Sequence, residues 1–131
     1  MKVETVFADT NLFLRYLTDD VPAQADLAEG LLHRAAKGEV ALVTTSLVIA
    51  EIVWTLESYY HLPKRDVQAK VLAILNTAGL KVADAELVMQ AIGGYAEKNV
   101  DFIDAYNAAW MLKNDICPSS PPPTSPNLSA R

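Results

Sequence analysis

The chain has 131 residues, 51% of them hydrophobic, and a net charge of −5 at pH 7. A chain of this size forms one domain, and its apolar fraction supplies a core that needs neither disulfides nor a structural metal. The single cysteine, Cys117, has no partner within the chain, as is usual for proteins of a reducing compartment. The acidic balance argues against a protein that holds nucleic acid through a basic overall field, so any nucleic-acid contact is expected to be local.

No apolar run approaches the roughly 20 residues that a membrane-spanning helix needs. Glu4 and Asp9 stand within the first ten residues, which is unlike a secretory signal peptide. We therefore expect a cytoplasmic protein that does not bind a membrane.

The composition changes near Asp115. The last residues, 116–131, read ICPSSPPPTSPNLSAR and hold five of the seven prolines. Proline lacks the backbone donor that helices and central strands need, and a short Pro/Ser tract has little apolar surface to bury. The sequence therefore predicts one globular domain over residues 1–115 and an irregular Pro/Ser-rich tail over residues 116–131.

Short β-favouring runs alternate with longer runs of helical spacing along the globular part. Strands are predicted at residues 3–8, 40–43 and 80–83, and helices are predicted to begin near residues 10, 22, 45, 63, 84 and 101. Strands separated by helical crossovers predict an α/β fold with a parallel sheet and helices on both of its faces. Ligands in such folds bind at the carboxyl ends of the strands.

Two acids stand out in this pattern. Asp9 ends the first predicted strand, where an α/β sheet places its chemistry, although it could equally cap the helix that begins at Thr10. Glu51 lies in the run LVIAEIVW, a helical stretch that is apolar all round, so its carboxylate is expected to be buried. A buried carboxylate is either paired in a salt bridge or bound to a metal ion.

Two more acids, Asp101 and Asp104, open the last predicted helix, which is otherwise nearly all apolar. An acid at the cap and another three residues later are typical of a helix start, where they interact favourably with the helix dipole. Taken alone, this pair would be interpreted as a cap.

Taken together, the motifs resemble those of the PIN domain, and most closely its VapC-type toxins. The resemblance rests on Asp9-Thr10-Asn11, on the apolar helix that carries Glu51 after Thr44-Thr45-Ser46, and on Asp101-Phe102-Ile103-Asp104-Ala105. It implies a three-layer α/β/α sandwich and a homodimer. It also implies a metal-dependent RNA endonuclease, the toxin of a toxin–antitoxin module, inhibited by a cognate antitoxin protein.

The resemblance assigns roles to seven residues. Asp9, Glu51 and Asp104 would be the catalytic acids that hold Mg²⁺ or Mn²⁺, with Asp101 as an accessory acid, and Thr10, Asn11 and Ser46 would lie behind them and orient them. Both ions are hard cations that prefer oxygen ligands, which accounts for a site built from carboxylates.

The chain departs from the family after the last helix. Relatives continue into a fourth strand that ends in a Thr-x-Asp motif, whose aspartate is a fourth acid, but here the C-terminal strands are missing or replaced by the proline tract. Asp115 lies 11 positions after Asp104, which is about 16 Å along one helix and too far to share an ion. The departure predicts impaired activity, and the alternative is a non-catalytic PIN-like protein that retains dimerisation and antitoxin binding.

Other classes of protein fit less well. A phosphatase of the haloacid dehalogenase type needs a second aspartate where Asn11 stands, and no glycine-rich phosphate loop is present. The aromatic residues are interpreted as core or dimer-interface residues: Trp54, Tyr59, Tyr60 and Trp110. Apolar residues on the predicted helices 63–77 and 84–98 favour a homodimer: Val67, Val71, Leu75, Leu87, Val88 and Ile92.

Overall fold

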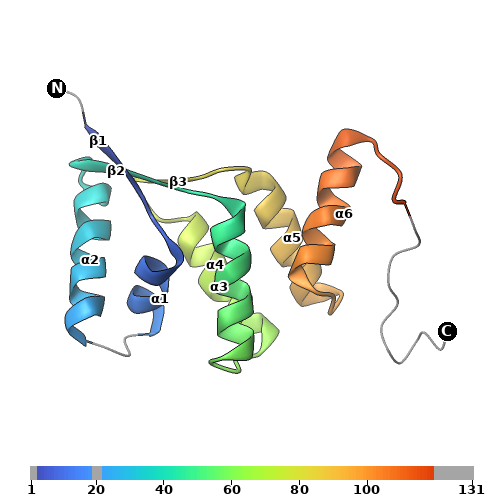
Figure 1. Ribbon diagram of the computed structural model, residues 1–131, viewed down its shortest axis with the longest axis horizontal. Helices are drawn as coiled ribbons and strands as arrows, with labels where there is room; N and C mark the ends of the chain where they lie inside the picture. The colour runs from blue at the N-terminus through green and yellow to red at the C-terminus, as the bar shows by residue number, and fades with distance from the viewer. Residues whose placement is uncertain (1–2, 19–21, 120–131) are drawn as a thin grey trace.

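The computed structural model describes residues 3–18 and 22–119 of the chain. Within these residues the elements are β1 (Glu4–Phe7), α1 (Thr10–Thr18), α2 (Pro22–Ala36), β2 (Val40–Thr44), α3 (Ser46–Ser58), α4 (Lys64–Leu75), β3 (Leu80–Val82), α5 (Ala85–Glu97) and α6 (Phe102–Asn114). Figure 1 shows α1 and α2 side by side at one end of the molecule and α5 packed against α6 at the other. This arrangement confirms the predicted α/β class.

The three strands form one parallel sheet in the order β1-β2-β3. Val6 pairs with Leu42, and Leu42 in turn pairs with Leu80. The central strand β2 alternates between buried and half-buried residues, whereas β1 is largely exposed. Two helices separate each strand from the next, as parallel pairing requires.

The strand β1 lies at an edge of the sheet. No strand follows α6 in the described part of the chain, which reaches residue 119. The rest of the predicted tail, residues 120–131, lies outside the described residues.

Gly79 sets the close approach between the start of β3 and the end of α2. Its φ of +82° is in the left-handed region, and a Cβ at this position would lie 2.2 Å from the carbonyl oxygen of Ala35. Its own carbonyl accepts a hydrogen bond from the amide of Leu42 at 3.0 Å. Only glycine fits this position without displacing the backbone.

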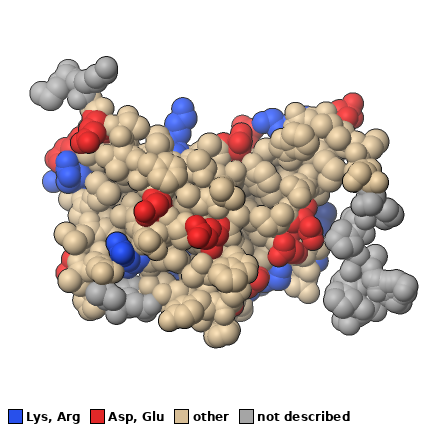
Figure 2. All heavy atoms as spheres, in the orientation of Figure 1, with Lys and Arg blue, Asp and Glu red and all other residues tan. Residues whose placement is uncertain are grey.

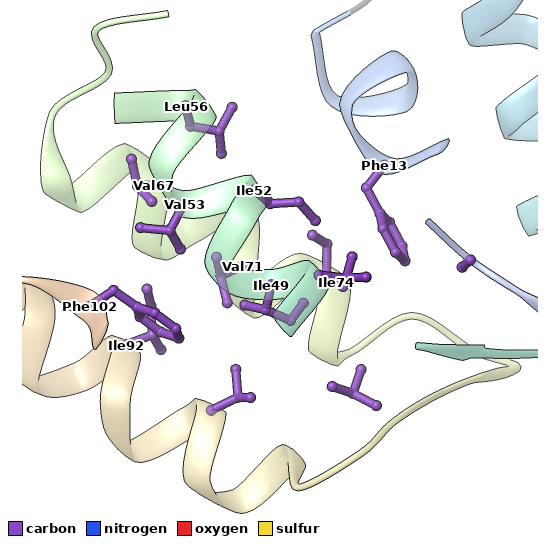
Figure 3. Close-up of a cluster of buried hydrophobic side chains, with 14 of the residues drawn as sticks. Phe13, Ile49, Ile52, Val53, Leu56, Val67, Val71, Ile74, Ile92 and Phe102 are labelled. Carbon is purple, nitrogen blue, oxygen red and sulfur yellow. The ribbon is translucent and has the colours of Figure 1, made fainter. Parts of the chain in front are cut away.

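The main core lies between α3 and α4. In Figure 3, Ile49 and Val53 of α3 lie close to Val71 and Val67 of α4 in one buried cluster, and Ile52 extends toward Phe13 of α1. The core also takes in residues from the two ends of the molecule: Phe13 of α1, Ile92 of α5 and Phe102 of α6. The packing of α3 against its neighbours therefore fixes the two elements that carry the predicted acids at their starts, α1 and α6.

The exposure of the side chains bears on two interpretations made from the sequence. Most of the apolar residues offered for a dimer are buried within the chain itself: Val67, Val71, Leu87, Val88 and Ile92. Of the aromatic residues interpreted as core or dimer-interface residues, Trp54, Tyr59 and Trp110 are 66%, 70% and 44% exposed. They lie outside the core of this chain, and their place in a dimer interface stays a prediction. Helical spacing identifies an apolar face but not the element that covers it.

None of the helices in the described residues is both long and apolar enough to cross a membrane.

Candidate functional site

The first predicted acid, Asp9, lies between the end of β1 and the start of α1. Asp9 is exposed, and its Oδ1 accepts a hydrogen bond from the amide of Leu12 at 3.0 Å, which makes it the N-cap of α1. Just before it, the buried hydroxyl of Thr44 donates to the carbonyl of Ala8 at 2.7 Å and joins the ends of β1 and β2. The cap uses one oxygen of Asp9 and leaves the other as a possible ligand.

The second predicted acid is linked directly to the first motif. The hydroxyl of Thr10 donates to Oε1 of Glu51 at 2.5 Å and connects the start of α1 to the middle of α3. This contact agrees with the expectation that Thr10 orients a site carboxylate. It brings Glu51 next to the residue that follows Asp9.

Glu51 is nevertheless exposed, and the expectation that it is buried is wrong. The physical reason is that its apolar neighbours on the same face of α3, Leu47 and Trp54, are themselves 78% and 66% exposed. The face of α3 that carries Glu51 therefore points outward even though most of its residues are apolar. The salt bridge found in the described residues joins Arg34 to Glu39, and Glu51 takes part in none there.

The third motif begins α6. Oδ2 of Asp101 accepts a hydrogen bond from the amide of Ile103 at 3.2 Å, so the cap interpretation holds for this residue. Asp104 is exposed one turn later. It lines a groove of about 560 Å³ between α5 and α6, together with Lys98, Val100 and small residues of α6.

Ser46 joins α3 to α6. The hydroxyl of Tyr106 donates to Oγ of Ser46 at 3.2 Å, which ties the first residue of α3 to the second turn of α6. Tyr106 also packs against Phe102, with ring centroids 6.3 Å apart. The sequence motifs do not single out Tyr106, because its role depends on the crossing of two helices distant in sequence. Asn11 is exposed on α1.

The structure therefore brings the first and second motifs into contact and joins the third to α3 through Tyr106. Among residues 3–18 and 22–119, no three His, Cys, Asp or Glu side chains form a group that could hold a metal ion. The convergence of Asp9, Glu51 and Asp104 on one ion stays a prediction. The donor set fits Mg²⁺ or Mn²⁺ by its chemistry, since all three residues offer carboxylate oxygens.

The surface charge agrees with the sequence. On the face shown in Figure 2, acidic side chains form several separate groups with basic side chains between them. Neither sign gathers into one large patch on this face, so it offers no basic surface for a phosphate backbone.

The comparisons with known proteins give one family. No curated protein and no solved structure matches the chain significantly. The PIN domain model matches residues 6–116, a stretch that contains all of the predicted site residues. The chain therefore belongs to the PIN domain family, whose members are generally nucleases that use divalent metal ions.

Proposed function

We propose that this chain is a metal-dependent endoribonuclease of the VapC type, the toxin of a toxin–antitoxin module. The observation that supports this most is that the family match spans all three acidic motifs in their order along the chain. The contact between Thr10 and Glu51 adds support, because it joins the first two motifs in space.

Each acid has a distinct structural role in the proposed site. Asp9 is oriented by the amide of Leu12, and Glu51 is oriented by the hydroxyl of Thr10. Asp104 follows the capped start of α6, which brings it to the surface at the groove beside α5. Asp9, Glu51 and Asp104 would hold Mg²⁺ or Mn²⁺, with Asp101 as an accessory acid.

The chain's own residues would supply position and charge rather than a nucleophile. When bound, the metal ion would supply the positive charge that activates a water and stabilises the leaving oxygen of an RNA phosphodiester. The two histidines, His33 and His61, lie outside the acidic motifs, and the exposed Cys117 follows α6. The carboxylates would also limit RNA binding in the absence of a cation, because they repel phosphate.

The experiment is RNA cleavage by the purified chain in Mn²⁺, in Mg²⁺ and in a chelator. Cleavage is expected with either ion and not with the chelator. Asp9→Asn, Glu51→Gln and Asp104→Asn are expected to abolish it, whereas Asp26→Asn, at an exposed acid of α2, is the matched control and is expected to keep it. Cleavage that survives the chelator or the three substitutions would exclude the proposal.

A second candidate is a non-catalytic PIN-like protein that keeps its partner surfaces. It is favoured by the sheet, in which no strand after α6 adds to β1 in the described residues. The test compares cleavage in Mn²⁺ by this chain with cleavage by a variant whose tail is replaced by a strand ending in Thr-x-Asp. The first candidate in its impaired form predicts slow cleavage that the replacement accelerates, and the second predicts none by the unmodified chain.

We also propose the partners that the VapC type implies: RNA as substrate, a cognate antitoxin protein and a second copy of the chain, all in the cytoplasm. The exposed side chains of Leu47, Trp54 and Tyr59 on and after α3 offer apolar surface for such contacts. Sedimentation of the purified chain at micromolar concentrations tests the homodimer. A monomer at all concentrations would contradict it.

A further inference from the structure

A lysine outside the three motifs contacts the segment that precedes α6. The ammonium of Lys64, at the start of α4, donates to the carbonyl oxygen of Val100 at 2.8 Å. The same ammonium lies 3.8 Å from the centroid of the Tyr95 ring, which is the geometry of a cation–π interaction. Lys64 therefore links α4, α5 and the segment between α5 and α6.

The aromatic partner is held firmly. Tyr95 is fully buried, and its hydroxyl donates a short hydrogen bond to the carboxylate of Glu57 on α3. Its ring also packs edge-on against Phe102 at a centroid distance of 6.4 Å. Because the ring is fixed by two neighbouring elements, it offers the lysine a defined position rather than a mobile one.

Two carboxylates act on the charge of the Lys64 ammonium. Burial lowers the pKa of Lys64, while the carboxylates of Glu57 and Asp101 act in the opposite direction. Asp101 is the N-cap of α6, so a charge that stabilises the start of this helix also faces the lysine. The ammonium of Lys64 thus interacts with Glu57 of α3 and with the segment that leads into α6.

The held segment determines where Asp104 lies. Asn99 adopts a left-handed φ of 54°, Val100 accepts the lysine's hydrogen bond, and Asp101 caps α6. Asp104 follows three residues after the cap, on the first turn of the helix.

We propose that Lys64 is a positioning residue for the nuclease site: by holding Val100 against the ring of Tyr95, it fixes the start of α6 and with it Asp101 and Asp104. This inference rests on the proposed function, since it concerns the geometry of the same acids. Lys64 touches neither the metal nor the RNA in this role, and acts only through the segment that it holds.

The test uses Mn²⁺ alone as the probe, with calorimetric titration and amide hydrogen exchange as readouts. Lys64→Met removes the ammonium and keeps most of the aliphatic chain, and it is expected to weaken Mn²⁺ binding by about tenfold, as loss of an outer partner of metal ligands does. Exchange is expected to rise in residues 100–106 and to stay unchanged in α3. Lys64→Arg keeps a donor and a cation and is expected to retain both properties.

Two control variants separate positioning from charge and from stability. Arg65→Met removes the same charge from the next, exposed residue and is expected to leave Mn²⁺ affinity unchanged. Leu32→Ala, at a buried core residue of α2, is expected to destabilise the fold while keeping Mn²⁺ affinity. A rise in Mn²⁺ concentration is expected to restore RNA cleavage by Lys64→Met.

Three outcomes would overturn the inference. The first is wild-type Mn²⁺ affinity in Lys64→Met, and the second is an equal loss of Mn²⁺ affinity in Arg65→Met or Leu32→Ala. The third is a rise in exchange spread evenly over the whole domain, which would make Lys64 a general contributor to stability. If the unmodified chain neither binds Mn²⁺ nor cleaves RNA, the proposed nuclease function is wrong. The positioning role of Lys64 is then wrong as well, because it depends on that function.

Discussion

The hydroxyl of Thr10 donates to the carboxylate of Glu51 at 2.5 Å across 41 residues of sequence. It links the residue that follows Asp9 to the centre of α3, and so joins two of the three acidic motifs. A hydrogen bond to a charged acceptor is stronger than one between neutral groups, although exposure to water reduces its net contribution. The contact is therefore expected to orient Glu51 more than to stabilise the fold.

Replacement of Thr10 by valine keeps the shape of the side chain and removes the donor. We expect Thr10→Val to lower the free energy of unfolding by only about 1 kcal/mol, the usual contribution of one hydrogen bond, and to weaken Mn²⁺ binding. Urea denaturation and calorimetric titration measure the two effects. Thr10→Ser keeps the hydroxyl and is the control. Equal behaviour of the two variants would show that the hydroxyl does not orient Glu51.

Replacement of Glu51 by glutamine tests whether this acid serves the site or the fold. The side chain is exposed, and the amide oxygen can still accept the hydrogen bond from Thr10. We expect the free energy of unfolding without metal to stay the same, because the side chain is exposed, or to rise if Asp9 and Asp104 lie close enough to repel Glu51. Mn²⁺ binding is expected to weaken. A loss of several kcal/mol without metal would show instead that the carboxylate of Glu51 serves the fold.

The alkaline limit of stability is expected to depend on Tyr95. Burial, together with the hydrogen bond to Glu57, raises the pKa of Tyr95 above its usual value of 10.0. The unfolded chain therefore releases this proton at a lower pH than the folded chain does. The contribution of Tyr95 is fully present below about pH 10 and is lost as the pH rises further.

Tyr95→Phe removes this titration. Near neutral pH the variant is expected to be about 1 to 3 kcal/mol less stable than the unmodified chain, because it leaves Glu57 without its donor. The difference is expected to shrink above pH 10, where only the unmodified chain loses the contribution of the tyrosine proton. Urea denaturation from pH 8 to 11 measures it. A difference that stays constant over this range would contradict the prediction.

Gly79 is expected to be the least replaceable glycine. Gly79→Ala combines a left-handed φ with a Cβ placed 2.2 Å from the backbone of Ala35, so we expect a loss of about 3 kcal/mol, as for overpacking of a fixed site. Gly30→Ala is the control, because its added Cβ would meet no atom within 4 Å beyond the local backbone of α2. It is expected to stabilise by about 0.5 to 1 kcal/mol. Thermal and urea denaturation compare the two.

The sequence alone determines the order of the elements. Asp9, Thr45 and Asp101 cap the helices that follow them, as their positions before apolar helical runs indicate. The apolar spacing also identifies the short strands, and their alternation with helices predicts the parallel sheet. These features are local, because a cap or an amphipathic period involves residues within one or two helical turns.

Only the tertiary structure decides which faces are covered. The apolar run around Glu51 predicts burial, yet Leu47 and Trp54 are exposed beside it, because the other side of α3 supplies the packing against α4. The contacts of Lys64 with Val100 and Tyr95, and of Tyr106 with Ser46, join residues from separate elements and leave no periodic signal in the sequence. Such contacts depend on how helices cross, and the crossing is set by the whole core rather than by any single segment.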